Sequence, residues 1–198
     1  MAARSTMAYL INEVRVRTNT GTASTLETHG TVGYWGDDQI EDVLDRHRVD
    51  IWRMSLNAQP TYNGGTVVYK DFPTGQTYLE ETNAGTAVFY LEDGTNAQVG
   101  TALYSVDYQR GYVTFASNTG GSAYHMTARS YDPDAAAAEM WRIMASWYAT
   151  DFDFSTDNHA VKKSAIIDNC MKMANFYDAK SKTGSFNVTT LWRSDVAY

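Results

Sequence analysis

The sequence predicts an α+β fold: a helical bundle with an inserted small antiparallel β-sheet or barrel module and an extended C-terminal tail. N-terminal helices and a C-terminal helical hairpin would form the bundle. The prediction rests on changes of hydrophobic period along the chain. Apolar residues recur at helical steps over residues 1–60, give way to clusters of Val, Thr, Tyr and Phe over 61–131, and return to helical steps over 132–183. Residues 184–198 are too few to form a domain and predict a tail.

Composition limits the classes of function. The 198 residues are 43% hydrophobic and 20% charged, as expected of a folded soluble chain. A net charge of −7 argues against a protein that grips nucleic acid through a basic face. With Cys170 as the single cysteine, neither a disulfide framework nor a thiolate metal cluster is expected. We find no signal-peptide core and no membrane-spanning stretch, so we expect a soluble chain made in the cytoplasm, with no membrane partner.

In the N-terminal helical part, residues 9–16 predict a short helix. The next segment, WGDDQIEDVLDRHRVDIW (35–52), carries apolar residues at three- and four-residue steps through Trp52. Acidic residues at its start suit the helix dipole, and Asp37 is the expected N-terminal cap. A second helix that runs through Trp52 is therefore predicted.

The β module is predicted from five or six short clusters between Gly65 and Tyr131: TVVYKDF, QTYLEE, TAVFYLED, ALYSVDY, GYVTFAS and AYHMTARSY. DYQRGYVTF predicts a hairpin in which Gly111 supplies the permissive backbone of the turn. EDGTNAQ predicts a second turn.

The helical hairpin is predicted over 134–150 and 158–179. Asp132 is the expected cap of its first helix, with Pro133 at the first helical position. The connector DFDFSTDNHAVKKSA (151–165) predicts a turn between the helices, in which Ser155 and Asp157 are candidate caps of the second helix. Ile166, Cys170 and Ala174 are expected on the apolar face of that helix, because they recur at four-residue steps.

The same connector fits a calcium-binding loop only in part. Asp151, Asp153 and Ser155 fit the first ligand positions of an EF-hand loop, but Thr156 stands where glycine is needed and Lys162 where a bidentate glutamate is needed. No paired-histidine metal motif, phosphate-binding loop or nucleophile elbow occurs elsewhere. We therefore predict no catalytic residue, metal or cofactor, and expect that the protein is not an enzyme.

The order of these segments resembles a known family. The helix start YWGDDQIEDVLDRHRVDIW, the β insert that closes with GYVTFAS, the segment YDPDAAAAEMW, the connector and the terminal LWRSDVAY together resemble tailed-bacteriophage head–tail adaptor proteins, also called connector or head-completion proteins. The likeness extends from about Tyr9 to Tyr198. One departure is Asn158, which stands where the family usually has glycine.

The resemblance implies a structural virion protein without catalysis. Such adaptors form a ring, usually a dodecamer, beneath the portal protein at the head–tail junction, after assembly in the host cytoplasm. The ring extends the channel through which genomic DNA passes without sequence-specific binding, and it gives a tail or stopper protein a surface on which to dock. In such a ring each subunit uses two different patches in head-to-tail contact with copies of itself, and aromatic and Met-rich helix faces could supply these patches.

The tail is the predicted segment for contact with the portal or with a neighbouring subunit. NVTTLWRSDV is too apolar for a solvated end, and an extended segment can add to a sheet or lie in a groove. Candidate contact residues, with Trp192 as anchor and Arg193 as ion-pair donor, are Val188, Leu191, Trp192, Arg193 and Asp195. The competing interpretation is that the tail packs on its own helices.

Two other functions stay open. The β module could bind a carbohydrate by stacking sugar rings on its tyrosines, namely Tyr62, Tyr69, Tyr78, Tyr104, Tyr108 and Tyr112. Period-two alternation predicts that about half of these face a core. The chain could also be a neighbouring neck protein, such as a stopper or tail-completion protein.

Overall fold

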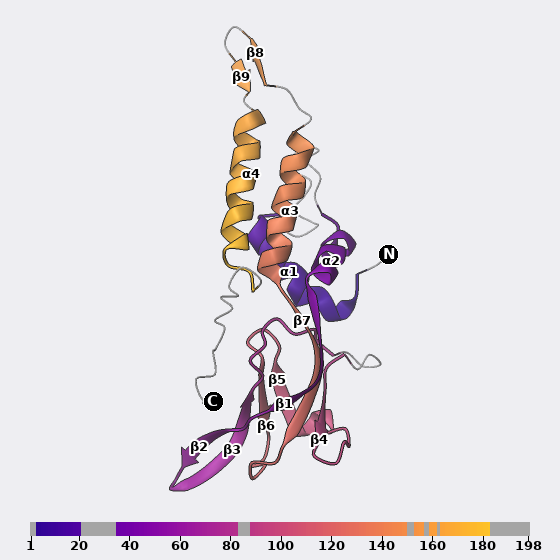
Figure 1. The fold of residues 1–198 in the computed structure, drawn as a ribbon, viewed down its shortest axis with the longest axis vertical. Coiled ribbons are helices and arrows are strands. Elements are labelled where there is room, and N and C mark those ends of the chain that lie inside the picture. The colour runs from indigo at the N-terminus through magenta and orange to yellow at the C-terminus, as the bar shows by residue number, and fades with distance from the viewer. Residues whose placement is uncertain are drawn as a thin grey trace, which may run out of the picture.

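The computed structural model describes residues 3–20, 35–82, 88–149, 153–156, 159–161 and 163–182. Helices in this part of the chain are η1 (Ser5–Met7), α1 (Ala8–Thr18), α2 (Asp37–Arg46), η3 (Thr101–Leu103), α3 (Pro133–Tyr148) and α4 (Lys163–Asp178). The strands are β1 (Arg48–Leu56), β2 (Gln59–Asn63), β3 (Thr66–Pro73), β4 (Tyr90–Asp93), β5 (Tyr104–Asp107), β6 (Tyr112–Phe115), β7 (Tyr124–Tyr131), β8 (Phe154–Thr156) and β9 (His159–Val161). The molecule is elongated: helices α3 and α4 lie side by side toward one end, and the sheets form the other (Figure 1).

The predicted fold class is wrong. The described chain is a strand-rich α+β structure with four α-helices and two antiparallel sheets that hold seven strands between them, rather than a helical bundle with a small insert. One sheet has the order β1-β7-β4 and the other β2-β3-β6-β5. Strand β1 and the beginning of β2 fall within residues 1–60, which were expected to be helical.

The error begins at the end of α2. This helix stops at Arg46, and β1 begins at Arg48 and pairs antiparallel with β7. Ile51 lies opposite Ala128 in that ladder instead of continuing the apolar face of a helix. Val49, Ile51 and Trp52 all suit a strand, and pairing with a partner almost 80 residues away along the chain outweighs the local helical spacing.

The β-sheets enclose a core of their own. Its buried hydrophobic residues, which come from both sheets and from the segments between their strands, are Leu56, Phe72, Leu79, Phe89, Leu91, Val113, Phe115, Met126 and Ala128. Phe72 meets Phe115 edge-on, with 5.2 Å between ring centroids. The hairpin predicted around Gly111 is confirmed as β5 and β6, with φ +70° at the glycine. The predicted strand QTYLEE is absent from both sheets and contributes one isolated bridge, from Leu79 to Ser130.

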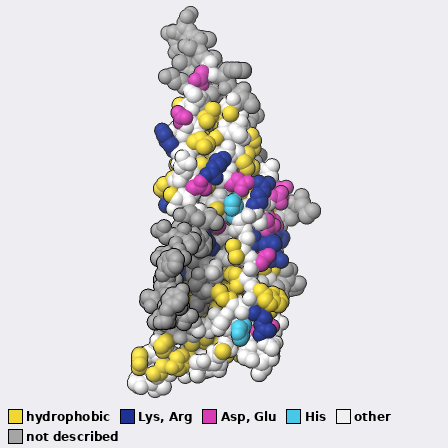
Figure 2. Space-filling view, in the orientation of Figure 1, with side chains coloured by type: hydrophobic (Ala, Val, Ile, Leu, Met, Phe, Trp, Pro, Cys, Tyr) yellow, Lys and Arg dark blue, Asp and Glu magenta, His cyan; other side chains and the backbone are white. Residues whose placement is uncertain are grey.

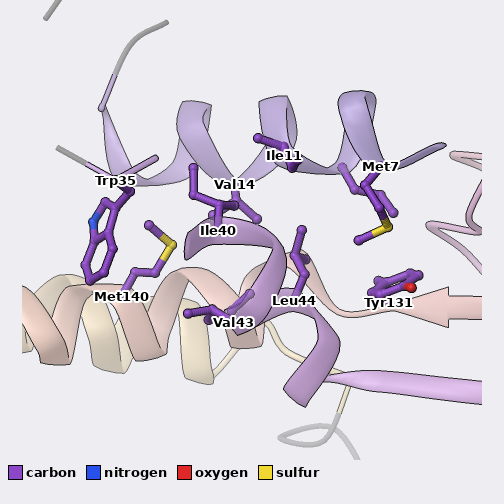
Figure 3. Packing of buried hydrophobic residues seen from close by; sticks show 11 residues of the cluster. Met7, Ile11, Val14, Trp35, Ile40, Val43, Leu44, Tyr131 and Met140 are labelled. Carbon is purple, nitrogen blue, oxygen red and sulfur yellow. The ribbon is translucent and has the colours of Figure 1, made fainter. Parts of the chain in front are cut away.

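A second core joins helices α1, α2 and α3 (Figure 3). Its buried members line the facing sides of these helices and the end of β7, and they are Met7, Leu10, Ile11, Val14, Trp35, Ile40, Val43, Leu44, Tyr131, Ala136 and Met140. Figure 3 shows Met140 of α3 close to Trp35 and Ile40. Tyr131 ends β7 immediately before α3 begins, so the backbone passes directly from one core to the other.

Helices α3 and α4 are joined by a different connector from the one expected. Strands β8 and β9 pair as a short hairpin beyond the helix ends (Figure 1). The second helix of the predicted hairpin therefore begins at Lys163 rather than at 158. Asp153 supports this start from a distance, because its carboxylate accepts hydrogen bonds from the backbone N–H of Ser164 at 3.0 Å and from its hydroxyl at 2.8 Å.

Candidate interaction surfaces

The residues proposed for partner binding fall outside the described part of the chain. Val188, Leu191, Trp192, Arg193 and Asp195 all belong to residues 183–198, which the structure does not describe. Their predicted contacts with a portal or a neighbouring subunit therefore stay predictions.

Of the four residues predicted to cap helices, one is confirmed as a cap. Asp132 is the N-cap of α3, and its carboxylate accepts from the backbone N–H groups of Asp134 and Ala135. Asp37 is the first residue of α2 rather than its cap: the cap position belongs to Gly36, whose N–H donates to the Gln39 side chain. Ser155 lies inside β8 and caps no helix. Asp157 lies outside the described residues.

Asp37 has another role. Its carboxylate pairs with the guanidinium of Arg15 on α1, so it ties the start of α2 to the first helix. The buried Arg15 also donates to the Trp35 carbonyl oxygen at 3.1 Å. The position of Asp37 at the start of a helix predicted a cap. The buried Arg15 on another helix instead determines where the Asp37 side chain points.

A buried carboxylate joins the helical and β parts. The Glu80 side chain is fully buried and accepts hydrogen bonds at 2.7 Å from the hydroxyls of Thr6 and Tyr131. Guanidinium nitrogens of Arg4 and Arg129 lie 3.6 Å and 3.5 Å from its oxygens. Because a buried charge is costly unless it is paired and hydrogen-bonded, this cluster favours one fixed arrangement of η1, β7 and the segment that carries Glu80.

Two side chains of this junction have shifted pKa values. Burial raises the pKa of Tyr131, and the hydrogen bond to Glu80 raises it further. Burial would lower the pKa of Arg4, but its hydrogen bonds to Glu41 and Asp45 outweigh that effect and the pKa is raised. Both shifts hold the groups in the protonation states that the network requires.

The last described residues are anchored at the same junction. The Lys182 ammonium donates to the carbonyl oxygens of Thr77 and Tyr131 and to the Ser130 hydroxyl, at 2.8–2.9 Å. Its backbone N–H donates to Asp132 at 2.6 Å. Burial lowers the pKa of Lys182. Lys182 therefore ties the segment after α4 to the point where β7 meets α3.

Strand β1 presents the most exposed tryptophan of the described chain. A bulge between Ile51 and Met54 interrupts its pairing with β7, and Arg53 within the bulge has φ +47°. Trp52 is 75% exposed there. A bulge re-aims side chains, and a non-glycine residue with positive φ is held at a cost in free energy. The bulge therefore turns a large aromatic ring toward solvent.

A hollow of about 400 Å³ lies beside this ring. It is lined by residues of β1, β7 and the approach to β4: Asp50, Ile51, Trp52, Val88, Tyr90, Thr127, Ala128 and Arg129. Arg129 Nε lies 3.6 Å from the Asp50 carboxylate, and these two residues are directly paired in the β1–β7 ladder. The sequence pattern predicted a helix for Ile51 and Trp52, so it did not indicate this site.

The β2–β3 hairpin extends from the sheet end of the molecule (Figure 1). Every residue of β2 is exposed, and Tyr62 is 81% exposed. Four of the six tyrosines proposed to stack on sugars are buried at least in part: Tyr104 and Tyr108 pack on the β core, Tyr78 packs on the helical core, and Tyr69 is half-buried. The expected division of the tyrosines between core and surface is therefore confirmed for these residues.

Helix α4 has one buried stripe and one exposed face. Cys170 and Ala174 are buried where α4 packs against α3, as expected for the cysteine, and burial raises the pKa of the Cys170 thiol. On the outer side Phe176 is 49% exposed. The Lys180 ammonium lies 4.0 Å from the centre of the Phe176 ring, in a cation–π contact.

Charged side chains gather in a band across the middle of the molecule, at the height of α1 and α2 (Figure 2). At the end of α2, Arg46 and His47 both contact Glu139 of α3, and His47 Nε2 lies 2.8 Å from the Glu139 carboxylate. Glu139 therefore links the C-terminal end of α2 to α3 through two side chains. In the described part of the chain no group of three or more His, Cys, Asp or Glu side chains could hold a metal ion. Within the same residues, no helix is long and apolar enough to cross a membrane.

Neither the comparison with protein-family models nor the comparison with curated proteins finds a match for this chain. The resemblance to head–tail adaptors therefore stays a prediction from the sequence.

Proposed function

We propose that this chain is a structural neck protein of a tailed bacteriophage. It would form an adaptor ring at the head–tail junction, join the portal protein to a tail or stopper protein, and extend the DNA channel without catalysing a reaction. The resemblance in segment order supplies the family, and the exposed surfaces supply the physical support.

The observation that carries the proposal is that large apolar side chains are exposed in two separate parts of the subunit. In the α3–α4 pair, Trp147, Ile166, Met171 and Phe176 are each 37–49% exposed. On strands β1 and β2, Val49, Trp52 and Tyr62 are 57–81% exposed. In a closed ring each subunit uses two different patches, one for each neighbour, and aromatic residues are common anchors of such contacts. Exposed apolar residues at two different places on an elongated subunit suit that requirement.

The net charge of the subunit supports the proposed role in a DNA channel. A subunit with a net charge of −7 gives a strongly acidic ring. Acidic walls repel a polyanion, so DNA would pass along the channel without being held.

The test is negative-stain imaging together with light-scattering mass, on the full chain alone and mixed with the portal protein of the same phage. We expect rings that stack on the portal. A chain that stays monomeric in both conditions would refute the adaptor function.

A second candidate is carbohydrate binding by the β part, and one hollow favours it. This hollow, of about 360 Å³, is lined by apolar side chains that include Leu103, Phe115 and Tyr124 and by polar ones that include Asp93 and Asn118. Aromatic surface beside hydrogen-bonding groups suits the CH faces and hydroxyls of a sugar, and the volume lies within the range of small-ligand sites. Binding on a glycan array, lost in Tyr124→Ala, would favour this function over the adaptor.

A further inference from the structure

The β1-β7-β4 sheet has an outer face that points away from the β core. Met126 and Ala128 of β7 are buried in that core, so Thr127 between them points to the outer face. Tyr90 of β4 pairs directly with Thr127, and the bulge of β1 lies opposite Thr127 on the other side. Thr127 therefore lies at the centre of the outer face, with one strand on each side of it.

The hollow of about 400 Å³ lies at this part of the sheet, and an aromatic side chain lines it from each flanking strand. Trp52 comes from the bulge of β1 and is 75% exposed, while Tyr90 comes from β4 and is half-buried. Neighbouring strands are about 4.8 Å apart, so β1 and β4 are about 10 Å apart across β7. Rings in contact have their centres roughly 4.5–7 Å apart, so one ring of a ligand held between these strands reaches both side chains.

The hollow also contains hydrogen-bonding groups that the chain itself leaves unused. Within the described residues, the Trp52 indole N–H and the Tyr90 hydroxyl have no hydrogen-bond partner. The Thr127 hydroxyl oxygen accepts from the Arg53 backbone N–H at 3.3 Å and keeps its own O–H to donate. The Asp50 side chain is 63% exposed, so its carboxylate keeps acceptor positions for a ligand. Donors and acceptors therefore lie beside the two aromatic rings.

The bulge that positions Trp52 is held in a strained conformation. Arg53 has φ +47°, which is uncommon for a residue other than glycine. Its guanidinium reaches β4, where Nε lies 3.2 Å from the Glu92 carboxylate, and it also donates to the Asn96 side chain in the turn that follows. Strained residues cluster at ligand sites, and bulges re-aim side chains at such sites. These contacts of Arg53 fix the exposed Trp52 at the edge of the hollow.

The chemistry of these groups matches a sugar. A saccharide ring has a CH face that packs on aromatic side chains, and its hydroxyls both donate and accept hydrogen bonds. A flat aromatic ligand would cover the rings but leave Asp50 and Thr127 without partners, which lowers affinity. An anionic ligand would meet the Asp50 carboxylate. Because Asp50 lies 3.6 Å from Arg129, the charge of the hollow is balanced and an uncharged saccharide fits best.

We propose that the Trp52 hollow, which we define as Asp50, Trp52, Tyr90, Thr127 and Arg129, binds an uncharged mono- or disaccharide. One sugar ring packs between Trp52 and Tyr90, and its hydroxyls form hydrogen bonds with Thr127 and Asp50. The inference goes beyond the adaptor function and stands without it. It shares its ligand class with the second candidate function but places the sugar in a different hollow.

Isothermal titration calorimetry of the full chain with maltose, cellobiose, lactose and diacetylchitobiose tests the site. At least one of these uncharged disaccharides should bind with a Kd of about 1 mM or tighter. Trp52→Ala should raise that Kd about tenfold or more, because the exposed stacking surface is lost. Trp52→Phe keeps a ring and should raise the Kd less. Tyr62→Ala removes a ring that is 81% exposed outside the hollow, so this control should leave the Kd unchanged.

Tryptophan fluorescence locates the sugar independently of affinity. Binding should change the emission of the original chain, because Trp52 lines the hollow, and should leave the emission of Trp52→Phe unchanged. Circular dichroism checks that each variant keeps the helix content of the original chain, as expected for a side chain that is 75% exposed.

Three results would overturn the site: no binding of any disaccharide, equal affinity of Trp52→Ala and the original chain, or tighter binding of the peptide Gly-Tyr-Gly than of any sugar. The last result would make the ligand an aromatic peptide. Binding that survives Trp52→Ala but is lost in Tyr124→Ala would overturn the site as well, and it would favour the second candidate function. These results do not depend on ring assembly, so failure of the site and failure of the adaptor function are separate outcomes.

Discussion

Removing the Glu80 carboxylate should destabilise the protein more than any single change to its surface charges. The side chain is fully buried and accepts two hydrogen bonds at 2.7 Å, from Thr6 on η1 and Tyr131 at the end of β7. Glu80→Ala leaves both hydroxyls buried without this acceptor, and each such loss costs about 1–3 kcal/mol. Arg4 and Arg129 also lose a nearby negative charge, although Arg4 keeps Glu41 and Asp45.

These contributions give an expected loss of about 3 kcal/mol in the free energy of unfolding, at the low end of the roughly 3–5 kcal/mol for breaking a buried pair. A chain of this size loses about 2–4 °C of Tm for each kcal/mol, so the Tm should fall by roughly 6–12 °C. Tyr131→Phe removes only one of the hydrogen bonds and should cost about 1–2 kcal/mol.

The assay is urea denaturation followed by circular dichroism, with thermal melting alongside. Glu81→Ala is the matched control: it removes the same charge from the neighbouring position, which is only half-buried and has no ion pair among the described residues. Its expected effect is within about 0.5 kcal/mol. Equal stabilities of the Glu80→Ala and Glu81→Ala variants would refute the view that the Glu80 cluster holds the helical and β parts together.

Two further predictions concern the backbone and pH. Gly111→Ala should cost several times as much stability as Gly64→Ala in urea denaturation: both glycines have positive φ, but a Cβ at Gly111 would overlap the Gln76 carbonyl oxygen, whereas a Cβ at Gly64 meets nothing within 4 Å. Equal losses would show that the turn can shift. Stability should also fall as the pH rises above about 10, because burial raises the pKa of Tyr9 and Tyr131 in the folded state while unfolded tyrosines ionise near 10. Urea denaturation at about pH 8 and pH 11 measures this fall, which Tyr9→Phe should reduce; an unchanged fall in that variant would contradict the assignment to Tyr9.

The features that the sequence predicted correctly are set by neighbouring residues. Asp132 followed by Pro133 marked the start of α3, since both residue types satisfy needs of the first helical turn. Gly111 marked the β5–β6 hairpin because a turn with positive φ favours glycine. Such signals act over a few residues and do not depend on the rest of the fold.

The features that it missed depend on distant partners. The helical spacing through Trp52 was genuine as a pattern, but residues 48–56 pair with β7, and nothing near them in the sequence indicates that partner. The start of α4 was misplaced for the same reason, since Asp153 supports it from across the β8–β9 hairpin. The fold class followed these errors, because moving β1 and β2 out of the helical part makes strands dominant.

The candidate surfaces were the hardest to predict, because apolar spacing shows which side of an element is hydrophobic but not whether another element covers it. Ile166 was expected on the buried face of its helix, together with Cys170 and Ala174. Cys170 and Ala174 are buried, whereas Ile166 is 37% exposed. The reason is its position: Ile166 lies near the end of α4 that is farthest from the sheets (Figure 1). A pair of helices that extends from a body leaves apolar surface exposed unless a further layer covers it. A second copy of the chain would supply that layer, and for this reason the exposure of α4 is as informative about assembly as its buried stripe is about the fold.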